Sequence, residues 1–275
     1  MQTGIMEKSI VIKNSRIYYQ VSGNGTPVVL VHGFAEDHDL WRYQHAALSK
    51  HYLLIVPDLP GSGKSDMIDD MSIDGMADCI KQIIHHELPA TAVLAGVFMI
   101  GHSMGGYITL AFAEKYPEML LGIGLFHSTA YEDSAEKKET RRRGITFIQT
   151  HGSYEFIKQS VPNLFTENYR TKNNAILAEM IARYSSFDRL ALTAYYEAMI
   201  LRPDRTTVLQ SFNKPVLFII GKNDKAIPFE DSMKQSHIPQ LAFIEIMETA
   251  AHMGMWEEKE KSNEVLLSFL QDAAL

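Results

Sequence analysis

The sequence predicts an α/β fold, in which a mostly parallel central sheet of about eight strands is covered by helices on both faces and carries a helical insertion. Three observations lead to this prediction. Short apolar runs rich in β-branched residues recur along the chain, helix-forming stretches separate them, and one long segment has helical periodicity without a strand. Apolar runs with almost no polar interruption are typical of strands buried on both faces of a parallel sheet.

Each expected element has a range. The strands are expected as a pair within residues 9–21, around a turn at 13–15, and then at residues 28–31, 52–56, 97–100, 120–126, 215–221 and 241–246. The helices that alternate with them are expected near residues 41–48, 72–86, 107–116, 229–236 and 256–270. Ser72 is a suitable N-cap for the second of these helices, and Pro89 should end or kink it. Residues 90–96 fit either a helix or a strand.

The helical insertion is expected at residues 128–205, between two halves of a sheet-bearing core at residues 1–127 and 206–275. Its apolar residues recur at helical spacing, and a segment that lies between two sheet strands can cover the edge of the sheet. The basic cluster Lys137–Arg143 is interleaved with acidic residues, which favours a solvated helix face. The sequence therefore predicts one core with a helical cap.

Composition excludes several classes of function. The 275 residues are 46% hydrophobic and 21% charged, which is typical of a globular protein with a large core. The formal net charge is −7, so no overall basic field would attract nucleic acid or an anionic membrane. The single cysteine, Cys79, cannot form an intramolecular disulfide and is expected to be a buried, inert thiol. No secretion signal or membrane-spanning run is recognised, so we expect a cytoplasmic protein.

The stretch Gly61–Ser65 resembles the end of a phosphate-binding loop. The complete motif needs a glycine five positions before Gly63, and that position is Asp58. Two prolines in the same loop, Pro57 and Pro60, reduce the number of free amides that could bind a phosphate. The sequence therefore predicts an ordinary loop after a strand rather than a nucleotide site.

The stretch Gly101–Gly106 carries the strongest functional signal. Ser103 lies between glycines where an apolar strand turns sharply into a helix, which is the pattern of a nucleophile elbow, although a simple turn would also use these residues. Small neighbours are needed because the serine backbone is strained and its hydroxyl must stand clear of the sheet. The helix that follows would direct its unpaired N–H groups toward the serine.

A serine hydroxyl needs a base, and the base needs a group that orients it. Parallel sheets collect functional residues at the carboxyl ends of their strands. Asp224 follows the strand and glycine turn that end at Gly221, and His252 follows the last strand. The chain order serine, acid, histidine is the order expected for this elbow. Glu230 and Asp231 are weaker candidates for the acid because they lie further along, in the next helix.

These residues predict acyl transfer. His252 would take the proton of Ser103 as the serine attacks a carbonyl, and Asp224 would hold the useful tautomer of the histidine. The developing oxyanion needs preorganised donors. We expect the backbone N–H groups of Met104 and Phe34 to supply them.

The chain resembles the cap-bearing branch of the α/β-hydrolase superfamily, which includes small serine esterases, C–C bond hydrolases, haloperoxidase-like enzymes and epoxide hydrolases. The resemblance covers nearly the whole chain. It rests on His32–Phe34, Asp58–Ser65, Gly101–Gly106, Gly221–Asp224 and His252. It implies one antiparallel strand near the start of the sheet and a cap between the sixth and seventh strands. Dehalogenases and epoxide hydrolases of this family carry aspartate as nucleophile, so Ser103 argues against both activities.

A pocket is expected between core and cap, where small ligands usually bind. His127 and Met253 are candidate pocket residues, as are Phe34, Met104 and several cap aromatics, although His127 could equally be a hinge residue. The cap aromatics considered are Phe147, Phe165, Tyr184, Phe187, Tyr195 and Tyr196. No metal-ligand spacing is evident and no cofactor is expected.

The expected function is that of a carboxylesterase, a cofactor-independent serine hydrolase of a small, largely apolar ester. The same residues would serve a C–C bond hydrolase, a thioesterase or an aminopeptidase, and a hydrolase-like ligand receptor would share the scaffold. The substrate and the oligomeric state are left open by the sequence.

Overall fold

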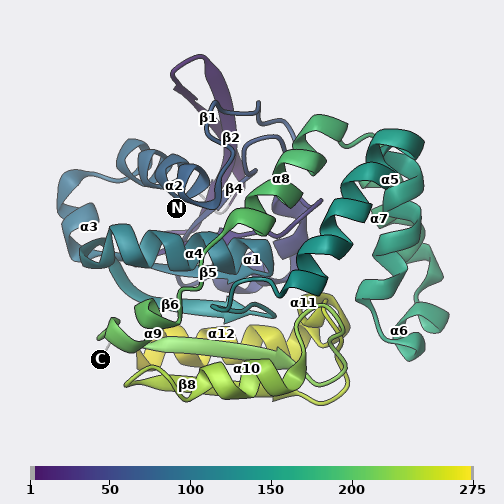
Figure 1. Ribbon diagram of the computed structural model, residues 1–275. Coiled ribbons are helices and arrows are strands. Elements are labelled where there is room, and N and C mark those ends of the chain that lie inside the picture. The colour runs from purple at the N-terminus through teal and green to yellow at the C-terminus, as the bar shows by residue number, and fades with distance from the viewer. Residues whose placement is uncertain (1–3, 274–275) are drawn as a thin grey trace.

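The computed structural model describes residues 4–273. Within these residues eight strands form one sheet in the order β1-β2-β4-β3-β5-β6-β7-β8 (Figure 1). The strands are β1 (Met6–Ile12), β2 (Ser15–Ser22), β3 (Pro27–Val31), β4 (Leu53–Pro57), β5 (Val97–His102), β6 (Leu120–Phe126), β7 (Val216–Gly221) and β8 (Ala242–Met247). Each strand expected from the apolar runs is present, so the predicted sheet is confirmed.

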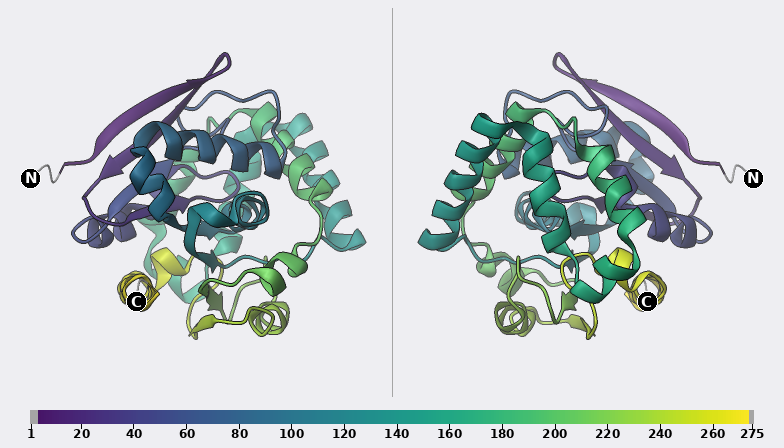
Figure 2. Two further views of the ribbon diagram at one scale, coloured as in Figure 1. Left: turned by 90° about the vertical axis from the view of Figure 1, so that its left-hand side faces the viewer. Right: turned by 90° about the vertical axis from the view of Figure 1, so that its right-hand side faces the viewer.

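The sheet is parallel except at its N-terminal end. Strand β2 runs antiparallel to both β1 and β4, and the other pairs of neighbours are parallel. The β1–β2 hairpin extends from one side of the molecule (Figure 2). Because strands β3 to β8 run in one direction, their carboxyl ends meet at one edge, where the loops after β3, β5, β7 and β8 come together.

The helices expected between the strands are present, with differences in two regions, and the helix at Thr206–Ser211 was not expected from the sequence. The helices outside the insertion are η1 (His38–Trp41), α1 (Arg42–Leu48), α2 (Ile73–Glu87), α3 (Ala90–Ala95), α4 (Met104–Lys115), η2 (Pro117–Met119), α9 (Thr206–Ser211), α10 (Phe229–Ser236), α11 (Gly254–Glu257) and α12 (Lys259–Asp272). The Ser72 side chain caps α2 by accepting from Gly75 N–H, as expected. Among residues 4–273 no helix is long and apolar enough to cross a membrane.

The two regions that differ are 90–96 and 256–270. The first, which fitted helix or strand, is helix α3 followed by Gly96. The second was expected to be one helix but is two, because Glu258 has non-helical backbone angles of φ −128° and ψ 54°. The Glu258 carboxylate accepts from the backbone N–H and hydroxyl of Thr249, at 2.9 and 2.7 Å, which holds the break in place.

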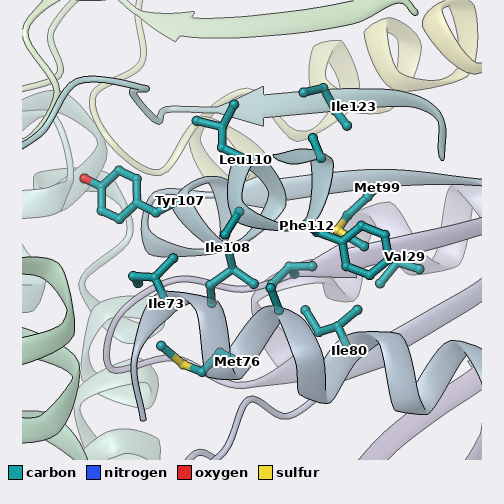
Figure 3. Close-up of a cluster of buried hydrophobic side chains, with 14 of the residues drawn as sticks. Val29, Ile73, Met76, Ile80, Met99, Tyr107, Ile108, Leu110, Phe112 and Ile123 are labelled. Carbon is teal, nitrogen blue, oxygen red and sulfur yellow. The ribbon is translucent and has the colours of Figure 1, made fainter. Parts of the chain in front are cut away.

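Two hydrophobic layers cover the sheet. On one face α2 and α4 pack over side chains such as Val29 and Met99 (Figure 3). On the other face α1 and α12 pack over Val28 and Phe98. Neighbouring residues of one strand thus face opposite layers, as the period of a strand requires. Cys79 lies within α2, is 2% exposed, and burial raises the pKa of its thiol to about 12, as expected for an inert thiol.

The helical insertion comprises the elements between β6 and α9. They are α5 (Ala135–Ser160), η3 (Val161–Leu164), α6 (Glu167–Lys172), α7 (Asn174–Tyr184) and α8 (Arg189–Leu201). In Figure 1, α5, α6 and α7 lie at the right, and α8 crosses the middle of the view. The basic stretch in α5 differs in part from its expected role. Lys138, Arg142 and their neighbours lie on the outer face, but the Arg141 side chain is only 12% exposed because it pairs with buried Asp133.

The loop after β4 binds its own carboxylate. Asp58 Oδ1 accepts from the backbone N–H of His38 at 2.9 Å, and Oδ2 accepts from that of Lys64 at 3.3 Å. A Cβ atom on Gly63 would stand 2.2 Å from Oδ2 of Asp58. The centre of the loop is therefore filled by an acidic side chain, which agrees with an ordinary loop rather than a phosphate site.

Candidate active site

Ser103 stands at the sharp turn between β5 and α4. Its backbone angles, φ 51° and ψ −115°, are strained for a residue with a side chain. The turn needs glycine on both sides of it. A Cβ on Gly101 would stand 2.2 Å from the carbonyl oxygen of Gly105, and one on Gly105 would stand 2.3 Å from that of Val31. The Ser128 hydroxyl donates to the Ser103 carbonyl at 2.7 Å and supports the turn.

Asp224 and His252 meet at the carboxyl ends of β7 and β8. Nδ1 of His252 lies 2.7 Å from Oδ2 of Asp224. The other carboxylate oxygen accepts from the backbone N–H groups of Ala226 and Ile227, at 2.8 and 3.0 Å, which leaves Oδ2 facing the histidine. Burial alone would raise the pKa of Asp224, but the adjacent His252 and the other donors hold it below its ordinary value. The carboxylate therefore stays ionised and orients the ring.

Ser103 and His252 line one cavity of about 890 Å³. Core residues Phe34 and Met253 line it as well, and the helical insertion supplies most of the opposite wall. The backbone N–H of His252 donates to the carbonyl of Leu164 at 2.9 Å, which joins the histidine loop to the insertion. A reacting carbonyl group would thus be enclosed between the two parts of the molecule.

The loop after β3 is held by a buried ion pair. Glu36 Oε2 accepts from the backbone N–H of Gly33 at 2.6 Å and lies 3.1 Å from Nδ1 of His102. The other ring nitrogen of His102 lies 3.0 Å from the carbonyl oxygen of His252. The Glu36–His102 pair therefore connects three parts of the site. They are the loop after β3, which carries Phe34, the end of β5 just before Ser103, and the loop that carries His252.

The charges of this pair stabilise each other. Burial alone would lower the pKa of His102 and raise that of Glu36. Their mutual attraction and hydrogen bond outweigh burial, so the pKa of His102 is raised and that of Glu36 is lowered. His102 precedes the predicted nucleophile in sequence, but only the tertiary structure reveals its acidic partner 66 positions away.

The backbone donors expected for an oxyanion occupy suitable elements. Met104 is the first residue of α4, so its N–H has no acceptor within the helix. Phe34 follows Gly33, whose own N–H is taken by Glu36, and precedes Ala35, which has a positive φ of 59°. The Met104 side chain, by contrast, is buried in the core and does not line the cavity, so only its backbone can take part.

His127 does not line the cavity, in contrast to the expectation. Its ring is fully enclosed, with Nδ1 accepting from Gly221 N–H at 3.0 Å and Nε2 lying 3.1 Å from Gly254 N. Nδ1 also lies 3.8 Å from Asp224, so the ring is packed beneath the Asp224–His252 pair. Burial lowers the pKa of His127 well below its ordinary value, which keeps the ring neutral. The alternation of strands and helices places His127 at the carboxyl edge of the sheet. It does not predict whether the imidazole ring points into the cavity or into the core.

The six candidate aromatic residues of the insertion divide evenly. Phe165, Tyr184 and Tyr196 line the cavity with Phe34 and Met253. Phe147, Phe187 and Tyr195 do not, and the Tyr195 hydroxyl instead donates to the Pro60 carbonyl at 2.6 Å. Sequence reasoning missed the charged wall of the cavity, which contains Tyr107, Arg141 and Arg202.

The fold and the arrangement of serine, histidine and carboxylate at the sheet edge define a hydrolase of the α/β class. The family model described as "alpha/beta hydrolase fold" matches residues 26–259. The chain therefore belongs to the α/β-hydrolase family.

Characterised relatives and solved structures cover nearly the whole chain. Lipase 1 of Psychrobacter immobilis is 26% identical over 255 residues, which is 90% of this chain and 78% of the lipase. The 2-hydroxy-6-oxononadienedioate/2-hydroxy-6-oxononatrienedioate hydrolase of Burkholderia vietnamiensis is 26% identical over 93% of this chain and 91% of its own length. The structure of a thermophilic esterase from Thermogutta terrifontis, with malate bound, superposes with a TM-score of 0.89 at 27% identity and covers 98% of this chain and 99% of the esterase. These relatives support an enzyme that catalyses hydrolysis.

Proposed function

We propose that this hydrolase cleaves small carboxylic esters through an acyl-enzyme formed on Ser103. His252 removes the Ser103 proton as the oxygen attacks the ester carbonyl, and Asp224 stabilises the charge that develops on the imidazole. The imidazole then protonates the leaving alcohol and activates a water molecule for deacylation. The backbone N–H groups of Met104 and Phe34 stabilise the oxyanion, and this chemistry needs no cofactor.

One observation carries the proposal. A serine with a strained backbone opens into the same cavity as a histidine whose Nδ1 is 2.7 Å from a buried, ionised carboxylate. A hydrogen bond from Nδ1–H to Asp224 fixes the tautomer in which Nε2 can accept a proton. Strain of this kind is retained where it serves a reaction.

The experiment is labelling with a fluorophosphonate probe, followed by mapping of the modified residue. We expect the label on Ser103 and not on Ser160, which also lines the cavity. Ser103→Ala should abolish labelling and reduce hydrolysis of short acyl esters by about 10³-fold or more. Ser153→Ala is the matched control, because Ser153 is buried in α5 away from the cavity lining. Undiminished turnover by Ser103→Ala would refute the proposal.

A second candidate is cleavage of a C–C bond by the same residues, and it is favoured by the similarity to the Burkholderia hydrolase. A panel containing short esters, thioesters, aminoacyl amides and vinylogous diketones separates these reactions. Tight ligand binding with negligible turnover across the whole panel would instead indicate a receptor.

We also propose that residues 128–205 act as a cap over the site, since α5, η3, α7 and α8 of this segment all contribute residues to the lining of the cavity. The substrate is then a small molecule that enters between cap and core. A cytoplasmic location remains a proposal from the sequence, and localisation of a tagged protein would test it.

A further inference from the structure

The cavity has a second polar region that the proposed mechanism does not use. Arg141 of α5 and Arg202, which follows α8, both pair with the carboxylate of Asp133. Nη2 of Arg202 lies 2.9 Å from Asp133 Oδ1, and Nε of Arg141 lies 2.5 Å from Oδ2. The side chains of Arg141, Arg202 and Asp133 are 12%, 3% and 0% exposed. All three residues line the cavity, together with Tyr107.

Positive charge is in excess at this wall. Two guanidinium groups share one buried carboxylate, and the nearby ammonium of Lys137 donates to a backbone carbonyl, that of Ala226, at 2.7 Å. Burial alone would raise the pKa of Asp133, but both arginines hold it below its ordinary value, so the carboxylate neutralises one of them. One buried positive charge therefore lacks a negative partner within the described residues, which is costly because both guanidinium groups are largely removed from solvent.

The remaining charged residues that line the cavity do not cancel this excess, because Glu36 is paired with His102 and the others are paired with each other or exposed. Exposed Glu132 pairs with Lys138, and Asp231 lies 3.5 Å from Lys234. Glu136 and Lys225 are also exposed, so water and salt screen them. The excess charge thus belongs to the inner wall.

Arg141 has donors available for a ligand. A guanidinium carries five N–H groups, and Asp133 accepts from Nε and Nη2 of Arg141. Arg202 is more fully committed, since it also donates to the carbonyls of Met199 and Tyr131. The Arg202 guanidinium carbon stands 3.9 Å from the centre of the Tyr107 ring. In Figure 3 the Tyr107 hydroxyl points away from the other labelled core side chains.

We propose that Arg141, Arg202 and Tyr107 bind a carboxylate group of the substrate, so that the preferred esters are half-esters of short dicarboxylic acids or esters of short hydroxy acids. This inference rests on the proposed function and specifies its substrate class. Tyr107 is the fourth residue of α4, whose first residue, Met104, directly follows Ser103, and three residues of helix rise by about 4.5 Å. A few carbon atoms therefore separate the ester carbonyl from the carboxylate, and the apolar lining contacts them.

The first experiment compares kcat/KM for matched esters. Monomethyl glutarate carries the carboxylate on the acyl side, 4-butyryloxybutanoate carries it on the alcohol side, and methyl pentanoate is the neutral reference. We expect wild type to prefer at least one of the anionic esters. Arg141→Gln should lower the ratio of anionic to neutral kcat/KM by about tenfold or more, because a charge-assisted, bidentate contact is lost.

Arg142→Gln is the control, because Arg142 is the next residue of the same helix and its side chain is 57% exposed. This control should leave the ratio unchanged. Equal losses on anionic and neutral esters in Arg141→Gln, or no preference for either anionic ester by wild type, would overturn the inference.

A binding measurement separates this inference from the proposed function. Calorimetric titration of Ser103→Ala with glutarate tests the subsite without turnover, and adding Arg141→Gln should weaken binding by about tenfold or more. Binding without any ester hydrolysis would support the subsite and refute the esterase. Hydrolysis without charge preference or glutarate binding would support the esterase and refute the subsite.

Discussion

The Glu36–His102 ion pair links three segments of the site, and its contribution to stability depends on pH. The raised pKa of His102 contributes stability below the ordinary histidine value of 6.5 that is lost as pH rises through the folded-state pKa. The lowered pKa of Glu36 contributes stability above the ordinary value of 4.5 that is lost as pH falls through the folded-state pKa. The pair is therefore most stabilising between these two ordinary values.

We predict that Glu36→Gln lowers the free energy of unfolding by about 3 kcal/mol near pH 5.5 and by less at pH 9, because it leaves a buried imidazolium unpaired only where His102 is protonated. Urea denaturation at several pH values measures the difference. Glu132→Gln, at an exposed ion pair, is the control and should show a small effect at each pH. An equal loss at both pH values would show that the pair is not ionised.

Asp224 allows a prediction for catalysis. Asp224→Asn keeps the size of the side chain but removes the charge that orients His252, so we expect kcat for a good ester to fall by about 10³ to 10⁴-fold while the protein stays folded. Steady-state kinetics with a circular-dichroism check measures this. The neighbouring Asn223→Ala removes only a contact to backbone carbonyls and should retain most activity. Similar activity in Asp224→Asn and wild type would exclude the proposed role of Asp224.

Residues at the strand ends could be assigned from the sequence because a strand, a sharp turn and a helix fix where each one emerges. The sequence places Asp224 and His252 after two strands in the order serine, acid, histidine, and in the structure Oδ2 of Asp224 lies 2.7 Å from Nδ1 of His252. Acidic residues interleaved with the basic cluster predict a solvated face for Arg141, but the structure buries it against Asp133, which lies eight positions earlier and outside the helix. Side-chain contacts between elements are not encoded in local periodicity, which is why the charged wall could not be foreseen.

Helix α5 is interrupted at Gly152, whose φ is 86° and ψ is 170°. A residue with a side chain is strained at this φ, although a Cβ there would meet no atom within 4 Å. We predict that Gly152→Ala lowers the free energy of unfolding by about 1–2 kcal/mol, from backbone strain alone. Thermal or urea denaturation measures it.

Gln149→Ala, at an exposed position in regular helix, is the matched control and should be neutral or slightly stabilising. A neutral Gly152→Ala would mean that the backbone at this position relaxes.

The two helix breaks differ in how far the sequence could indicate them. Glycine marks the break in α5, whereas Glu258 between α11 and α12 is a residue that regular helices accept. That second break depends on the contacts of Glu258 with Thr249, a residue of another segment. Tertiary contacts thus overrode helix propensity.

At the scale of the whole molecule, the helical insertion contacts the loop after β3 at Asp37. Arg183 of α7 donates to its carboxylate through Nε at 2.9 Å, and the Tyr184 hydroxyl lies 3.3 Å from it. Asp37 follows directly on Glu36, in the loop after β3 that carries Phe34. The ion pair therefore fixes the position of α7 relative to that loop.

We predict that Arg183→Ala raises KM for small esters several-fold with a smaller effect on kcat, because the cap then closes less tightly over the cavity. Hydrogen exchange of α7 amides should become faster in the same variant. The control is Arg189→Ala, at an exposed site in α8, which should leave KM and exchange unchanged. Unaltered exchange in Arg183→Ala would exclude a role for this ion pair in holding the cap.

The sequence predicts an insertion between two sheet strands from its helical periodicity. The order of the strands in the sheet depends on pairing between distant segments, which local patterns do not encode. The packing of the insertion on the core could not be predicted, because it depends on single contacts such as Arg183–Asp37.

The two ends of the helical insertion are tied together by the backbone. The N–H of Arg205 donates to the carbonyl of Ala130 at 2.8 Å, and the Arg205 side chain is anchored to Asp74 and Glu114 of the core. The chain thus leaves the sheet and returns to it at nearly the same point. A different helical insertion could replace this one at the junction without moving β6 or β7. Proteins of this fold can therefore differ in substrate specificity while the residues at the strand ends stay in place.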